Sequence, residues 1–158
     1  MIVAAAFVLA SAAFKPDAPM PRTAAYDGEG CGGRNISPEL HWRGAPRGTR
    51  SFALVVRDPD APVSGGFIHW VAYNIPANTR SLPANARLTP DQLGTTSRNE
   101  THYGGPCPPP GPAHHYIFTL YALDIPRLAG EHLTAAQLQQ AAAHHTLARA
   151  SLTALYSR

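Results

Sequence analysis

The stretch DPDAPVSGGFIHWVAYNIP, residues 58–76, decides the fold of this chain and carries most of its polar chemistry. It follows SFALVVR, residues 51–57, whose nearly continuous apolar character is typical of a strand covered on both faces. The two prolines of DPDAP lack an amide hydrogen and fix φ, so they end the strand pairing. Asp58 and Asp60 are therefore expected on a rigid corner at the strand end.

A second strand, Phe67–Ile75, returns after a glycine pair and completes a hairpin. Side chains alternate along a strand, so His69 is expected on the face of Val71 and Tyr73, opposite Trp70. One histidine and two aspartates are thus expected to meet at one end of the hairpin, which marks a candidate site.

Composition restricts the classes of protein to which the chain can belong. Its 158 residues fit a single domain, 1–158, with enough length to bury a core. The 16 prolines, scattered between apolar runs, favour short strands and ordered loops over a helical bundle. A net charge of +3 without runs of Lys and Arg argues against nucleic-acid binding, and no apolar segment is long enough to span a bilayer. We expect an all-β fold, an antiparallel β-sandwich with a few short peripheral helices.

The N-terminal segment MIVAAAFVLASAAF admits two interpretations. Its apolar run is like that of a secretory signal peptide, but the positive n-region is missing. We therefore favour a first strand, Phe7–Phe14, and leave the role of residues 1–6 open. A cytoplasmic or periplasmic location is expected, with the cytoplasm favoured.

Two further strands and two short helices are predicted. Leu40 and Trp42 are expected on one face of a strand, and HHYIFTLYAL, residues 114–123, is typical of a strand. Capping-box patterns begin at Thr89 and Thr134, and they predict a one-turn helix and a helix over roughly 135–145. Residues 147–156 fit either a helix or a strand.

The strand at 114–123 supplies the second half of the candidate site. His114 and Tyr116 share one face, whereas His115 points to the other and is expected to be exposed. The preceding loop, Gly104–Gly111, has backbone amides where side chains are absent, a common way to bind an anion.

Several motifs resemble the phosphatidylethanolamine-binding protein family, whose bacterial branch is often labelled Raf kinase inhibitor-like. They are DPDAP, then HW and NIP, and further along YGGPCPPPG and HHY. CGGRNISPELHW at 31–42 and HHTLARASLTALY at 144–156 are similar to further segments, so the resemblance covers most of the chain. The family's closing segment ends as a strand, so the resemblance assigns 147–156 to a strand.

The resemblance implies a small anion-binding pocket that takes phosphate, phosphorylethanolamine or a related ester, without chemistry, metal or cofactor. It also implies partners: membrane lipid head groups, a kinase or protease that is inhibited, and a second copy in a homodimer. The family usually has Arg where this chain has His115, and His lacks the permanent planar donor of Arg. The pocket residues that match are Asp58, Asp60, His69, Gly105, Pro106, Cys107, Pro108, His114 and Tyr116.

Physical chemistry supports an anion at such a site. An aspartate beside an imidazole fixes the tautomer of the ring and favours its protonated form. An imidazolium, backbone amides and a tyrosine hydroxyl then donate to phosphate or carboxylate oxygens. We therefore expect binding to strengthen as the histidines take up protons between roughly pH 5 and 8.

Three other interpretations use the same residues. Two histidines and a carboxylate can hold a metal, although HExxH and CxxC spacings are absent. Asp and His can also act as general acid and base, with Cys107 as a nucleophile activated by His69 or His114. The third is a surface that inhibits a partner protein without using the pocket. Cys107 can instead form a disulfide with Cys31, since the resemblance places both near the pocket mouth; in a reducing cytosol both would stay thiols.

Overall fold

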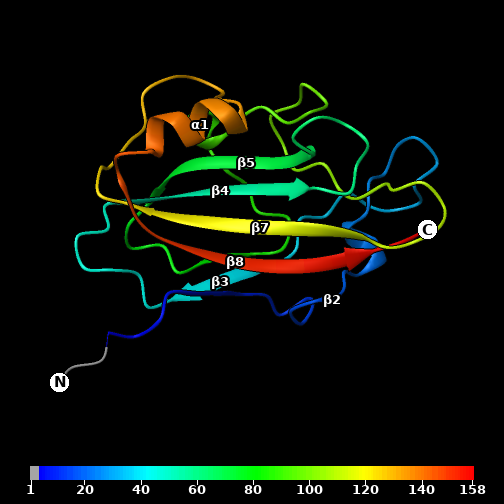
Figure 1. Ribbon diagram of the computed structural model, residues 1–158, viewed down its shortest axis with the longest axis horizontal. Coiled ribbons are helices and arrows are strands. Elements are labelled where there is room, and N and C mark those ends of the chain that lie inside the picture. Colours follow the sequence, from blue (N-terminus) through cyan, green and yellow to red (C-terminus); the bar gives the residue numbers. More distant parts are fainter. Residues whose placement is uncertain (1–3) are drawn as a thin grey trace.

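A computed structural model describes residues 4–158, and residues 1–3 of the segment left open above lie outside the described residues. The chain folds as a sandwich of a three-stranded sheet, ordered β1-β3-β6, and a five-stranded sheet, ordered β2-β8-β7-β4-β5 (Figure 1). The larger sheet is formed by β2 (Ala18–Pro19), β4 (Ser51–Asp58), β5 (Phe67–Pro76), β7 (His114–Leu123) and β8 (Thr146–Tyr156), and the smaller by β1 (Val8–Ala10), β3 (Leu40–Arg43) and β6 (Ser81–Leu82).

Among the described strands all pairs are antiparallel except β2 with β8, which is parallel. Two 3₁₀ turns, η1 (Arg22–Ala24) and η2 (Pro90–Gln92), and one helix, α1 (Ala135–Ala142), complete the regular structure. The all-β sandwich with short peripheral helices is therefore confirmed.

Two apolar layers hold these elements together. Between the sheets, Leu40 and Trp42 of β3 pack with Phe52 of β4 and Phe118 of β7 in one buried cluster. On the opposite face of the larger sheet, α1 covers a second cluster whose centre is the fully buried Leu138 (Figure 1). Strands β4 and β7 contribute to both layers, which explains why their sequences are apolar almost without interruption.

Most predicted elements are present, with differences at their ends. β7 has its predicted bounds, the tail is a strand, and the capping boxes at Thr89 and Thr134 open η2 and α1 as expected. The predicted strand Phe7–Phe14 is too long, because β1 ends at Ala10. Beyond that point Ser11 and Ala12 hydrogen-bond to Glu39 instead of a neighbouring strand.

The predicted face of His69 is wrong, because β5 contains a bulge there. Val56 pairs with Trp70 and the next residue, Arg57, pairs with Ile68, so His69 is an extra residue in the ladder. A bulge places successive side chains on one face and re-aims them. His69 consequently lies beside Tyr116, on the side of the inter-sheet layer, whereas Val71 and Tyr73 face α1.

Within the described part of the chain, no helix combines the length and the apolar character needed to cross a bilayer.

The layer beneath α1 can be tested with a truncation of Leu138. Leu138→Ala removes a fully buried side chain, so the free energy of unfolding in urea should fall by about 3 kcal/mol. The exposed neighbour Gln140 provides the control, because Gln140→Ala should change it by less than about 0.5 kcal/mol. Equal effects of the two changes would contradict the packing of α1 on the sheet.

Candidate functional site

The Asp58 carboxylate, at the end of β4, joins the two halves of the predicted site. Its Oδ1 accepts the backbone N–H groups of Asp60, at 2.8 Å, and Ala61, at 3.2 Å. Its Oδ2 lies 2.7 Å from Nδ1 of His114 at the start of β7. Both side chains are largely buried, with 5% of Asp58 and 14% of His114 exposed. Asp58 therefore fixes the DPDAP corner and the orientation of the His114 ring together.

His69 is a buried, neutral imidazole rather than the imidazolium expected from the sequence. Its Nδ1 lies 2.8 Å from the carbonyl oxygen of Gly104. Burial lowers the pKa of His69 from its ordinary 6.5 to about 4, and the positive charge of Arg98 acts in the same direction. The nearby Asp58 raises the pKa of His69, but by less than burial lowers it. The expected gain of charge on His69 between pH 5 and 8 is therefore wrong.

Tyr116 presents a hydroxyl group that the protein does not satisfy. The side chain is 1% exposed, and its oxygen makes no hydrogen bond of regular geometry among residues 4–158, although the Asp58 carboxylate lies close to it. Burial raises the pKa of Tyr116 well above its ordinary value, and the charge and hydrogen-bonding capacity of the nearby Asp58 carboxylate act in the same direction, so the group stays a hydroxyl. A buried polar atom without a partner costs about 1–3 kcal/mol, which a ligand acceptor would offset.

These side chains line a cavity of about 220 Å³. The ring of His69 meets the ring of Tyr116 edge-on, with centroids 5.1 Å apart, and the centroid of the Phe67 ring lies 4.9 Å from that of His69. The predicted pocket residues that the structure brings together around this cavity are Asp58, His69, Cys107, Pro108, His114 and Tyr116.

Asp60 turns away from the cavity and pairs with His115. Its Oδ2 accepts the backbone N–H of His115 at 2.7 Å and lies 2.8 Å from the Nδ1 of the same residue. The pair is half exposed, and the bonds to His115 hold the pKa of Asp60 below its ordinary value. Asp60 therefore fastens the DPDAP corner to the start of β7, and His115 is exposed as predicted.

The loop at Gly104–Pro109 does not provide the row of free amides that the sequence suggested. The N–H of Gly104 donates to the carbonyl of His69, and the N–H of Gly105 donates to Oδ1 of Asn35 at 2.7 Å. Three of the remaining residues are prolines, which have no N–H. Neither Gly105 nor Pro106 lines the cavity, so the loop shapes its wall without surrounding an anion with amides.

Arg98 supplies a positive charge to the cavity, and it is not among the site residues predicted from the sequence. Its Nη1 lies 3.0 Å from Oε1 of Glu29, and its guanidinium stacks 3.9 Å above the ring of Tyr26. Both Arg98 and Glu29 line the cavity. They come from long connections, where no period or spacing marks a functional residue, so no sequence signal could have identified them.

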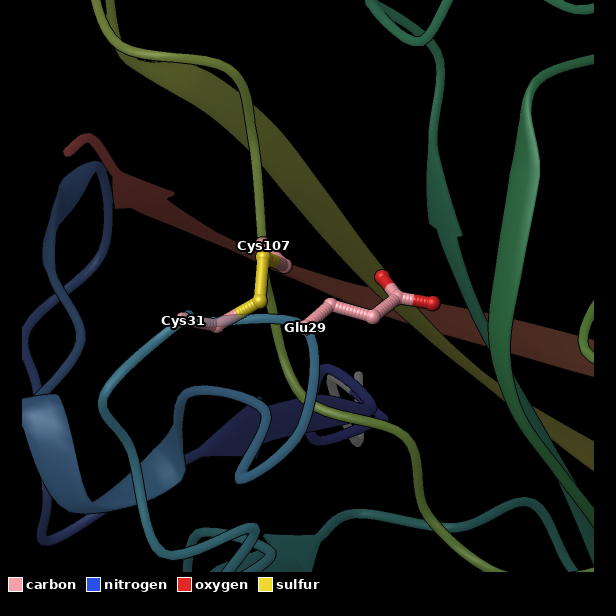
Figure 2. A group of neighbouring side chains, drawn as sticks. All are labelled: Glu29, Cys31 and Cys107. Carbon is pink, nitrogen blue, oxygen red and sulfur yellow. A yellow bond between two sulfur atoms is a disulfide. The ribbon is translucent and has the colours of Figure 1, made fainter.

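Cys31 and Cys107 are joined by a disulfide, with their Cα atoms 5.4 Å apart, and Cys107 lines the cavity (Figure 2). Together with Glu29 they form the one group of potential metal ligands within 4.8 Å of one another in the described range 4–158. In this oxidised state the sulfurs are bonded to each other, so neither is a thiolate ligand or nucleophile. The carboxylate of Glu29 extends away from the disulfide in Figure 2.

A second cavity, of about 380 Å³, lies at the start of α1 and contains none of the predicted site residues. Hydroxyl side chains and Arg57 line it, and Arg57 is already bonded to the carbonyl of Gly65. The smaller cavity, with its unsatisfied Tyr116 hydroxyl, is therefore the better candidate site.

Comparisons with known proteins agree with this fold and motif pattern. Residues 10–157 match the sequence model of the family described as phosphatidylethanolamine-binding protein. The chain is 41% identical over 145 residues to UPF0098 protein YbhB of Escherichia coli, which covers 87% of this chain and 92% of that protein. The solved structure of Escherichia coli YbcL is similar with a TM-score of 0.90 and 33% identity, covering 98% of this chain and 99% of that one. A phosphatidylethanolamine-binding protein homologue from Chlamydia trachomatis gives a TM-score of 0.86 and 36% identity, covering 97% and 98% of the two chains.

Reduction of the disulfide should destabilise the protein. Cys31 and Cys107 are 76 residues apart, so the bond restricts a long loop of the unfolded chain and contributes about 2–4 kcal/mol. Urea unfolding with and without dithiothreitol should show this loss. The double variant Cys31→Ser/Cys107→Ser is the control and should be insensitive to the reductant. A wild-type protein that is equally insensitive would contradict the bond.

The neutral state of His69 has a measurable consequence for acid stability. Because its pKa falls from 6.5 to about 4 on folding, the unfolded chain takes up the proton first as the pH decreases. This one group should lower the free energy of unfolding by about 3 kcal/mol between pH 6.5 and 4. Histidine ring signals in nuclear magnetic resonance should show His69 neutral at pH 6 with its hydrogen on Nδ1. Titration of His69 above pH 6 would contradict the environment described.

Proposed function

This chain belongs to the phosphatidylethanolamine-binding protein family, and we propose that its 220 Å³ cavity binds a small anionic head group such as phosphate, phosphorylethanolamine or a related ester. The observation that carries the proposal is the hydroxyl of Tyr116, which is buried in the cavity wall beside Asp58 and makes no hydrogen bond of regular geometry among residues 4–158. A phosphate or carboxylate oxygen is the acceptor that such a donor lacks.

The rest of the cavity supports an anion of this size. Arg98 supplies a permanent positive charge, and its guanidinium is held between the Tyr26 ring and the Glu29 carboxylate. Phe67 and the prolines of the two loops form an apolar wall that limits water around the ligand. The volume lies below the range of drug-sized pockets, so a head group fits better than a whole lipid.

The proposed function is binding without covalent chemistry. Asp58 uses both of its oxygens to hold the DPDAP corner and His114, which makes it a positioning group. Cys107 is the candidate nucleophile that the sequence offers, and in the oxidised protein its sulfur is bonded to Cys31. The cavity thus contains a histidine, His114, and the carboxylate of Asp58 that orients it, but no free nucleophile is paired with them.

Calorimetric titration with phosphorylethanolamine and inorganic phosphate tests the proposal. Tyr116→Phe should weaken binding about tenfold, since it removes one hydrogen bond to a charged ligand. The same change should leave the free energy of unfolding equal or slightly higher, because an unsatisfied buried hydroxyl is removed. His69→Ala and His114→Ala should abolish measurable binding.

His115→Ala is the matched control, because His115 is exposed and lies outside the cavity. It should bind as the wild type does. Failure of folded wild-type protein to bind either ligand, or equal binding by the Tyr116→Phe and wild-type proteins, would reject the cavity as the site.

A further inference from the structure

The hydrogen-bonding state of the two cavity histidines follows from their partners. The Gly104 carbonyl can only accept, so Nδ1 of His69 must carry the hydrogen, at 2.8 Å. The Asp58 carboxylate is likewise an acceptor, so Nδ1 of His114 carries a hydrogen, at 2.7 Å. In each neutral ring the other nitrogen, Nε2, then has a lone pair. Both rings line the cavity with Nδ1 turned to the protein, which leaves Nε2 for the ligand.

Burial keeps His69 neutral, while the charges that face it act in opposite directions: Asp58 favours its protonation and Arg98 opposes it. From β4 comes Asp58, from β7 come His114 and Tyr116, and from the loops come Arg98 and Glu29. Arg98 opposes a positive charge on His69, and its own charge is already paired with Glu29. The carboxylates of Asp58 and Glu29 in turn oppose a second negative charge on the ligand. The cavity thus offers few donors and several acceptors to an incoming anion.

We propose that the cavity selects phosphomonoesters in their singly protonated form over phosphodiesters, because Nε2 of His69 presents a lone pair that a P–O–H group satisfies. This inference rests on the proposed anion site and names the ligand class of that site. The phosphoryl oxygens accept from Tyr116 and Arg98, and the P–O–H donates to Nε2 of His69. A phosphodiester has no such hydrogen and places an oxygen or an ester group against that lone pair.

The pKa of His69 and the second pKa of the phosphomonoester decide which of the two groups carries the hydrogen of the bond between them. At pH 7, protonating a group of pKa about 4 costs a factor of about a thousand in population. A phosphomonoester has its second pKa near 6, so protonating the ester at pH 7 costs only about tenfold. At pH 7 it is therefore about a hundredfold less costly to place the shared proton on the phosphomonoester than on His69.

The test uses three amine-free probes with the wild-type protein: methyl phosphate, dimethyl phosphate and methylphosphonate. At pH 5 methyl phosphate and dimethyl phosphate carry the same single charge, and they differ in the P–O–H group and one methyl group. Methyl phosphate should bind at least tenfold more tightly. Its affinity should be constant below about pH 6 and fall about tenfold per pH unit above it, with uptake of close to one proton at pH 8.

Methylphosphonate identifies the group that titrates. Its second pKa is higher than that of a phosphate ester, so the break in its affinity profile should move to higher pH by the same amount. A break at one fixed pH for both probes would assign the titration to the protein and overturn the inference. Equal binding of dimethyl phosphate and methyl phosphate, or tighter binding of ethanolamine than of methyl phosphate, would also overturn it.

Failure of this inference is distinct from failure of the proposed function. If both esters bind with equal affinity, the anion site stands and the selection of a protonated ligand does not. If neither ester, methylphosphonate nor inorganic phosphate binds to folded protein, the site itself is rejected and the selection with it. The variant His69→Asn gives a second readout. Its side-chain amide can keep the bond to Gly104 but is too short to place an acceptor at the position of Nε2, so the difference between the two esters should shrink.

Discussion

The carboxylate of Asp58 is the acceptor on which the geometry of the site depends. One oxygen holds the DPDAP corner through two backbone amides, and the other orients the ring of His114. The end of β4 and the start of β7 are thereby fixed relative to each other. Because a carboxylate only accepts, it also decides which nitrogen of His114 is left for the cavity. A single buried group thus sets both the shape of the cavity and part of its hydrogen-bonding character.

Loops that are fastened at several points form the rest of the cavity. Asn35 bonds to Gly105 and to Tyr103, and the disulfide joins the loop of Cys31 to that of Cys107. Such bonds satisfy loop backbone groups within the protein, so few amides are left for a ligand. The free donors and acceptors lie instead on side chains of the strands and on Arg98. A rigid cavity of this kind requires little ordering of the protein when a ligand binds.

The sequence was sufficient for the sheets and insufficient for parts of the site. Apolar runs, prolines and capping boxes predicted β4, β5, β7 and two short helices, because these signals act within a few residues, whereas the strand at β8 followed only from the family resemblance. The bulge at His69 was not predictable, since it arises from the pairing of β4 with β5 and leaves the apolar pattern intact. The partners of Asp60 and Gly105, and the presence of Arg98, depend on contacts between distant loops. Such contacts have no local signature.

We propose that the Tyr116 hydroxyl and Nε2 of the neighbouring His69 bind the ligand. A crystal structure of the protein with methyl phosphate at pH 5.5 tests it most directly. The claim predicts a phosphoryl oxygen within hydrogen-bonding distance, about 2.5–3.0 Å, of the Tyr116 hydroxyl, with a second oxygen facing Nε2 of His69. An empty cavity at Tyr116, with the phosphate bound instead beside Arg57 at the start of α1, would contradict it.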